Sequence, residues 1–169
     1  DNDVDPMFHN LMAPYTRQTE EVVFSEKTAN GWKISTKLRN KCGSYTVTDT
    51  YQGTERGVLV TSVLHRVSGG REVPRFGKCF RLDAAFDAVH YLGRCGESYC
   101  DMKDQFPIRA VDCTVADMVE PNLRPQESGN RTDCTVAAVS DGKTRVVFEA
   151  VGRPFELGIK PYTDRELLA

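Results

Sequence analysis

Six cysteines are the residues with the widest chemical capacity in this 169-residue chain. A thiol can bind zinc, react as a nucleophile or pair into a disulfide. Structural zinc sites usually present two closely spaced ligand pairs, and here only Cys95 and Cys100 form a close pair. Their spacing also differs from that of a Cys-x-x-Cys redox centre. We therefore expect no metal site, and disulfides of open pairing among Cys42, Cys79, Cys95, Cys100, Cys113 and Cys134.

Histidines and carboxylates do not form a recognisable catalytic pattern. His9, His65 and His90 are isolated in the sequence, and no Gly-x-Ser-x-Gly motif accompanies them. Aspartates alternate in the first five residues like the start of a calcium loop. However, Pro6 and Met12 stand where that loop needs glycine and glutamate. The sequence therefore predicts that the protein is not an enzyme and has no certain cofactor.

The composition indicates a secreted domain. The net charge is −2 and the charges are well mixed, which argues against a nucleic-acid binder with a basic stripe. No apolar run approaches the roughly 18–20 residues that cross a membrane. Disulfides persist in oxidising compartments, which predicts an extracellular location. The sequon Asn130-Arg131-Thr132 lies in a polar stretch, 124–132, so we expect an exposed loop glycosylated at Asn130.

The first clear structural element is a hairpin near the N-terminus. Apolar and polar residues alternate from Trp32 to Leu38, which is typical of a half-buried strand. The turn dipeptide Asn30-Gly31 precedes this strand. Two-residue and three-residue loops are both compatible with the pattern. The three-residue loop is favoured because it places Val22 and Phe24 on the face of Trp32.

A second hairpin is predicted around Asp141-Gly142. A two-residue loop there pairs Ala137 with Val146 and Thr135 with Phe148, which gives one apolar face. The opposite face is polar near the tip, so we expect an antiparallel sheet with one side in water.

Short strand patterns separated by turn signals fill the rest of the chain. They predict an all-β fold, an antiparallel β-barrel of about eight strands braced by disulfides, with a β-sandwich as the alternative. Short helical pieces are expected at 83–92 and 164–169, although Tyr91-Leu92 also fits a strand. Residues 1–20 are interpreted as irregular and 21–169 as a single domain. The additional strands are expected at 45–51, 58–67, 76–82, 106–110 and 155–159.

The overall pattern resembles the lipocalins and the wider calycin group. The resemblance is based on chain length, many antiparallel strands, and the pair Gly31-Trp32, which the family separates by one residue. Thr48-Asp49-Thr50 is the analogue of a Thr-Asp-Tyr motif that the family carries later in its chain. The resemblance implies an eight-stranded barrel that carries a small hydrophobic molecule, with Trp32 at its floor.

Two functions are compatible with these patterns. The first is a secreted barrel that carries or sequesters a small hydrophobic ligand in its interior, because inward aromatic side chains can line a cavity. The alternative is a β-sandwich that acts by protein–protein contact through the loops 68–73, 93–103 and 118–130. The residues expected to contact the ligand are Trp32, Ile34, Tyr45, Phe80 and Phe148.

Overall fold

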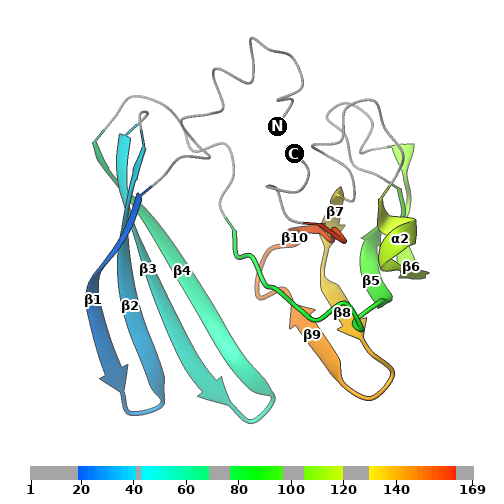
Figure 1. Cartoon of the computed structure of the whole chain (residues 1–169), viewed down its shortest axis with the longest axis horizontal. Helices are drawn as coiled ribbons and strands as arrows, with labels where there is room; N and C mark the ends of the chain where they lie inside the picture. The colour runs from blue at the N-terminus through cyan, green and yellow to red at the C-terminus, as the bar shows by residue number, and fades with distance from the viewer. Residues whose placement is uncertain (1–18, 41–42, 69–76, 97–104, 120–129, 163–169) are drawn as a thin grey trace. The chain divides into compact units, whose positions relative to one another are not determined.

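The computed structural model of this chain is an all-β protein, as the sequence predicts (Figure 1). It describes residues 19–40, 43–68, 77–96, 105–119 and 130–162. The chain divides into two compact units, which meet between Gly77 and Lys78 in the sequence. The single domain over 21–169 stays a prediction, and each unit is described here by itself.

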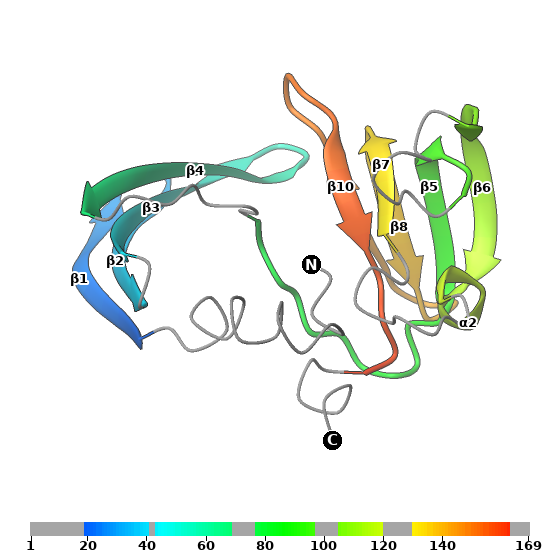
Figure 2. The ribbon, with the colours of Figure 1, turned by 90° about the horizontal axis from the view of Figure 1, so that it is seen from above.

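The first unit is one antiparallel sheet in the order β1-β2-β3-β4. Figure 2 shows it as a continuous, curved sheet. Threonine, valine and aromatic residues, which favour the pleated conformation, recur along these strands. The strands are β1 (Thr19–Thr28), β2 (Gly31–Asn40), β3 (Gly43–Thr54) and β4 (Gly57–Ser68).

The register of the first hairpin differs from both predicted registers. Thr28 pairs with Gly31, so the loop consists of two residues, 29 and 30. The register then shifts between Val22 and Phe24, as in a β-bulge. Val22 therefore lies opposite Thr36, on the face of Trp32 as predicted. Phe24 lies between the loop and the bulge, and the two-residue loop places it opposite Ser35 on the other face.

Gly31 is required by close backbone packing and not by a left-handed turn. A side chain at this position would collide with the carbonyl oxygen of Tyr51 on the neighbouring strand. The loop between β3 and β4 consists of Glu55 and Arg56, where the Thr54 hydroxyl donates to the Gly57 carbonyl (3.1 Å). Both turns are therefore tight, and both hairpins keep their strands in close register.

The second unit has a four-stranded antiparallel sheet in the order β6-β5-β8-β9 and a two-stranded sheet of β7 and β10. A one-turn helix, α2, follows β6. The elements are β5 (Ala88–Arg94), β6 (Ile108–Thr114), α2 (Val115–Met118), β7 (Asn130–Cys134), β8 (Val136–Ser140), β9 (Arg145–Glu149) and β10 (Phe155–Gly158).

The core of this unit lies on one face of the four-stranded sheet. Val89 and Tyr91 of β5 and the inward residues of β8 pack with Met118 of α2 and Cys134 of β7. Phe155 and Leu157 of β10 pack on the same cluster. The helix and the small sheet thus form a second layer, as in a sandwich. The fully or nearly buried members are Val89, Tyr91, Met118, Cys134, Ala137 and Val139.

The segment 130–140 contributes a strand to each of the two layers of this unit. Asp133 has a φ of 57°, in the left-handed region, and the next residues turn the chain from β7 into β8. At this corner the Thr135 amide donates to the Leu92 carbonyl (2.9 Å), and the Thr135 carbonyl accepts from the Ala150 amide (2.8 Å). The corner backbone is therefore fixed on both sides.

The β8–β9 hairpin keeps the predicted apolar face with a longer loop. Ala137 pairs with Phe148 and Val139 with Val146, so the pairing is displaced by two residues from the prediction. A two-residue displacement preserves the face on which each side chain lies. The loop comprises 141–144, where the Asp141 carboxylate accepts from the Lys143 amide (2.8 Å) and the Thr144 amide (2.6 Å).

The strand predicted at 76–82 and the helical piece predicted at 83–92 were wrong, whereas the alternative strand at Tyr91-Leu92 was confirmed. Residues 77–83 form no strand, and 83–92 contain a turn at Ala84 and Ala85 followed by β5. The Asp83 carboxylate accepts from the Ala85 amide (2.9 Å), which stabilises the turn. Residue 76 and the helix expected at 164–169 lie outside the described residues.

The predicted barrel was also wrong, because the described strands form separate sheets that do not close, which fits the sandwich alternative. Disulfide bracing is not supported either. The four cysteines in the described residues are free thiols: Cys79, Cys95, Cys113 and Cys134. Cys42 and Cys100 lie outside the described residues.

Candidate functional site

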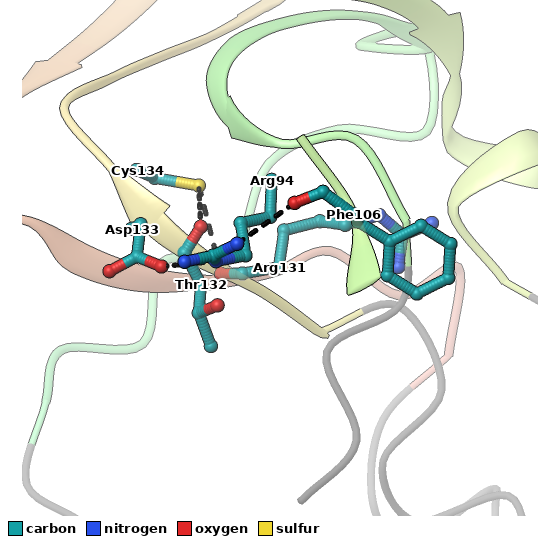
Figure 3. A network of polar contacts seen from close by, with 6 residues as sticks. All are labelled: Arg94, Phe106, Arg131, Thr132, Asp133 and Cys134. Carbon is teal, nitrogen blue, oxygen red and sulfur yellow. Dashed lines mark hydrogen bonds and ion pairs between the residues drawn. The ribbon is translucent and has the colours of Figure 1, made fainter. Parts of the chain in front are cut away.

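The most developed polar network of the second unit joins the ends of β5 and β7 (Figure 3). The Arg94 guanidinium donates through Nε to the Asp133 carboxylate (2.5 Å) and through Nη1 to the Phe106 carbonyl (2.9 Å). Arg94 is largely buried and Asp133 is partly exposed. This ion pair holds Asp133 in its left-handed conformation, and so positions the corner between the two sheets.

Two glycines allow the backbone to come close around this network. A Cβ at Gly93 would lie 2.5 Å from the Cys134 sulfur and 3.1 Å from the Thr132 carbonyl oxygen. A Cβ at Gly96 would collide with the ring of Phe106. Both positions are buried. Gly93 therefore lets β5 approach β7, and Gly96 leaves room for the ring of Phe106.

Arg131 is the second charged residue of this region and is almost fully buried, at 4% exposure. Its guanidinium donates to the Asn130 carbonyl (3.0 Å), the Tyr91 hydroxyl (3.3 Å) and the Met118 carbonyl (3.4 Å). Met118 ends α2, so Arg131 satisfies a helix C-terminal carbonyl. Burial raises the pKa of the Tyr91 hydroxyl, and the neighbouring Arg131 opposes that shift.

Two thiols of this unit, Cys134 and Cys113, have a raised pKa and are therefore poor nucleophiles. Burial raises the pKa of the Cys134 thiol to about 11, and burial followed by the charge of Asp117 raises that of Cys113. A thiol with that pKa is ionised in roughly one molecule in ten thousand near pH 7. The Cys134 sulfur lies 3.6 Å from the Arg131 carbonyl oxygen. Its environment is that of a packed core residue.

A histidine–aspartate pair lies on the outward face of the four-stranded sheet. His90 Nδ1 is 2.7 Å from Asp112 Oδ1, and their strands pair directly at these positions. The Asp112 side chain is 85% exposed, so solvent screens the pair strongly. This is a hydrogen-bonded pair at the surface of the sheet.

The carboxyl groups with shifted pKa values also have structural roles. Hydrogen bonds from the backbone and the hydroxyl of Thr114 lower the pKa of Asp117, which forms a capping box at the start of α2. Hydrogen bonds from the backbone amides of Thr144 and Lys143 lower the pKa of Asp141. A general acid needs a shift in the opposite direction. In the described ranges, no cluster of three metal-ligating side chains occurs.

The predicted ligand-binding residues divide between the two units. Phe80 and Phe148 do contact each other, with ring centroids 4.9 Å apart, and both belong to the second unit. Trp32, Ile34 and Tyr45 lie in the first unit, on one face of its sheet. Whether these residues contact a ligand stays a prediction.

That face of the first sheet is its apolar side. The aligned residues of β2, β3 and β4 on this side include Ile34, Leu38, Tyr45, Val47 and Leu64. Tyr45 and Val47 are buried, with exposures of 4% and 5%. Asp49 is also buried there, and it accepts a hydrogen bond of 2.6 Å from the Ser62 hydroxyl. The alternating pattern of β2 predicts this face.

Sequence reasoning did not find the Arg94–Asp133 and Arg131 network. The sequon pattern instead placed Asn130 in an exposed loop, whereas Asn130–Cys134 form β7 and Arg131 is buried. Glycosylation at Asn130 stays a prediction. A polar segment gives no sequence signal for burial, because its hydrogen-bond partners come from distant strands. The described parts of the predicted contact loops, 68, 93–96, 118–119 and 130, include residues of this network.

Comparison with known proteins gives a consistent result. The chain is 38% identical over 100 residues to a β-galactosidase of Priestia megaterium, which covers 58% of this chain and 10% of the relative. It is 34% identical over 102 residues to a β-galactosidase of Staphylococcus xylosus, covering 59% and 10%. A β-galactosidase of Halalkalibacterium halodurans is 29% identical over 128 residues, covering 74% and 12%. The chain thus spans about a tenth of the length of these relatives.

These findings overturn the resemblance to lipocalins, the secreted ligand carrier and the prediction that the protein is not an enzyme. The extracellular location itself stays a prediction. In the part of the chain that the structure describes, no helix has the length and apolarity to span a membrane. The family model described as the β-galactosidase small chain matches residues 1–169. The chain therefore belongs to the β-galactosidase small-chain family.

Proposed function

We propose that this chain is a non-catalytic part of a β-galactosidase, and that it works together with a larger polypeptide that carries the catalytic carboxyl groups. The observation that carries this proposal is the family match over the whole chain. The relatives named as β-galactosidases are about ten times longer than the matched region. The larger part of such an enzyme therefore lies outside this chain.

The chemistry of glycoside hydrolysis supports this division of roles. Most glycosidases use two carboxyl groups on either side of the scissile bond, one of which acts as a general acid. In the described residues, three carboxylates of the second unit are engaged in structural contacts. Asp133 pairs with Arg94, Asp117 caps α2 and Asp141 closes a hairpin loop. These carboxylates are suited to fixing the fold.

The fold supports a scaffolding role. The Arg94–Asp133 pair, the buried Arg131 and the tight hairpins fix the positions of sheets and loops without a mobile catalytic group. A rigid β module can stabilise a larger catalytic domain or complete its substrate site, because catalytic loops depend on the scaffold that positions them. The expected substrate of the whole enzyme is a β-galactoside.

Hydrolysis of a nitrophenyl β-D-galactoside tests the proposal. The chain is produced alone, the remaining β-galactosidase polypeptide alone, and the two together. We expect hydrolysis only when both are present, and co-elution of the two in size-exclusion chromatography. Hydrolysis by this chain alone would show that it is catalytic. Full activity of the larger polypeptide without this chain, and no co-elution, would refute the partnership.

A further inference from the structure

The apolar face of the first sheet has a gradient of burial along its strands. On β3, Tyr45, Val47 and Asp49 are buried, and Tyr51, further along the same face, is only half-buried. Tyr51 pairs with Trp32 of β2 and with Val60 of β4, which are 46% and 40% exposed. The face is therefore buried in the middle of β3 and open toward the hairpin loops.

Four side chains form this open end, which we call the hairpin-end patch: Trp32, Tyr51, Val58 and Val60. Val58 pairs with Gly53 on the same face and is 65% exposed. Exposed large apolar residues that adjoin one another usually mark a contact surface, because their exposure to water is unfavourable. Trp and Tyr are also among the residue types enriched at interfaces.

The opposite face of the same sheet is more polar. Ser35 and Thr48 lie opposite each other there, with their hydroxyl oxygens 3.0 Å apart. Val63 of β4 pairs with Thr48 on this face and is 44% exposed. An antiparallel sheet commonly has one wet face and one face packed on another layer. The polar face is the wet one, so the patch belongs to the packed side.

We propose that the hairpin-end patch is a docking surface for the larger β-galactosidase polypeptide. This inference rests on the proposed function, and it specifies where the two parts meet. The length of the relatives indicates what binds this patch, because about nine-tenths of each relative lies outside the matched region. A partner loop or strand with apolar side chains would extend the buried part of this face toward the hairpin loops and exclude water from Trp32.

Lysine substitutions on the two faces of β4 provide the test. Val60→Lys and Val58→Lys place a charge in the patch, and Val63→Lys is the matched control on the opposite face at similar exposure. All three sites are exposed, so each variant should fold, which circular dichroism verifies. Binding of each variant to the larger polypeptide is measured by surface plasmon resonance, beside galactoside hydrolysis by the reconstituted enzyme.

We expect the two patch variants to raise the dissociation constant by about tenfold or more, and Val63→Lys by less than about threefold. Equal effects of Val60→Lys and Val63→Lys, with normal binding by the wild type, would refute the patch but leave the proposed function intact. Failure of the wild type itself to bind would refute the proposed function. If patch variants disrupt only self-association of this chain, the occupant is a second copy and the inference is wrong.

Discussion

Substitution of Gly93 by alanine should destabilise the second unit through a steric clash of known geometry. Gly93 does not have a positive φ, so alanine can adopt its backbone conformation. The added Cβ would lie 2.5 Å from the Cys134 sulfur and 3.1 Å from the Cys134 Cα. Optimal contacts of such atoms are roughly 3.5–4 Å. Either β5 or β7 must therefore move.

The magnitude follows from two opposing effects. Overpacking of a filled core typically costs about 1–3 kcal/mol, and the upper part of that range applies because backbone atoms are also too close. Replacing glycine by alanine restricts the unfolded chain, which stabilises the fold by about 0.4–1 kcal/mol. The net loss in the free energy of unfolding should be about 2 kcal/mol. Gly158→Ala is the control, since its Cβ would meet no atom within 4 Å.

Hydrogen exchange at the β5 and β8 amides measures the opening free energy of this unit directly. Gly93→Ala should lower that free energy by about 2 kcal/mol, and Gly158→Ala should not lower it and should raise it by at most about 1 kcal/mol. Combining Gly93→Ala with Cys134→Ala removes the sulfur from the clash, so the two effects should be non-additive by about 1 kcal/mol. Additive effects, or no effect of Gly93→Ala, would refute the packing argument.

Two further predictions concern titratable groups. Because burial raises the pKa of Cys134 to about 11, iodoacetamide at pH 8 should modify the exposed Cys79 rapidly and Cys134 only after unfolding; peptide mass mapping would show equal rates if Cys134 were accessible and ionised. Backbone hydrogen bonds lower the pKa of Asp141, so its carboxylate stabilises the fold above about pH 4 and loses this effect as the pH falls through the lowered value. Asp141→Asn should therefore lower the melting temperature at pH 7 but not at pH 2, and a gap that is constant with pH would contradict this.

The sequence predicted local periodicity well and long-range pairing poorly. The alternation from Trp32 to Leu38 and the face shared by Ala137 and Phe148 were confirmed, because a period of two determines sides without determining exact partners. The first hairpin register was wrong from the loop onward, because the dipeptide Asn30-Gly31 marks a turn without showing which residues close it, and the bulge near Val22 has no simple sequence signal either. The α2 helix is only four residues long, too short to show a helical period.

The larger errors came from inferring the topology of the strands and the pairing of the cysteines from the composition of the chain. Barrel closure depends on which distant strands pair, and strand periodicity carries no information on that. The cysteine count predicted disulfides, but Cys134 is a buried thiol of the core and Cys113 is a partly buried thiol packed against it, where cysteine behaves as a small apolar residue. The Arg131 contacts could not be predicted, because Tyr91 and Met118 are far from it in sequence.

The corner at Asp133 and Thr135 has a consequence for how the second unit folds. Residues 130–140 supply one strand to each layer. Neither layer is therefore complete until this segment has formed both strands. Backbone hydrogen bonds of Thr135 with Leu92 and Ala150 connect the corner to β5 and to the end of β9. Such a segment couples the two layers into one cooperative transition. Its formation requires contacts that are distant in the chain, so we expect this unit to fold more slowly than a helical domain of its size.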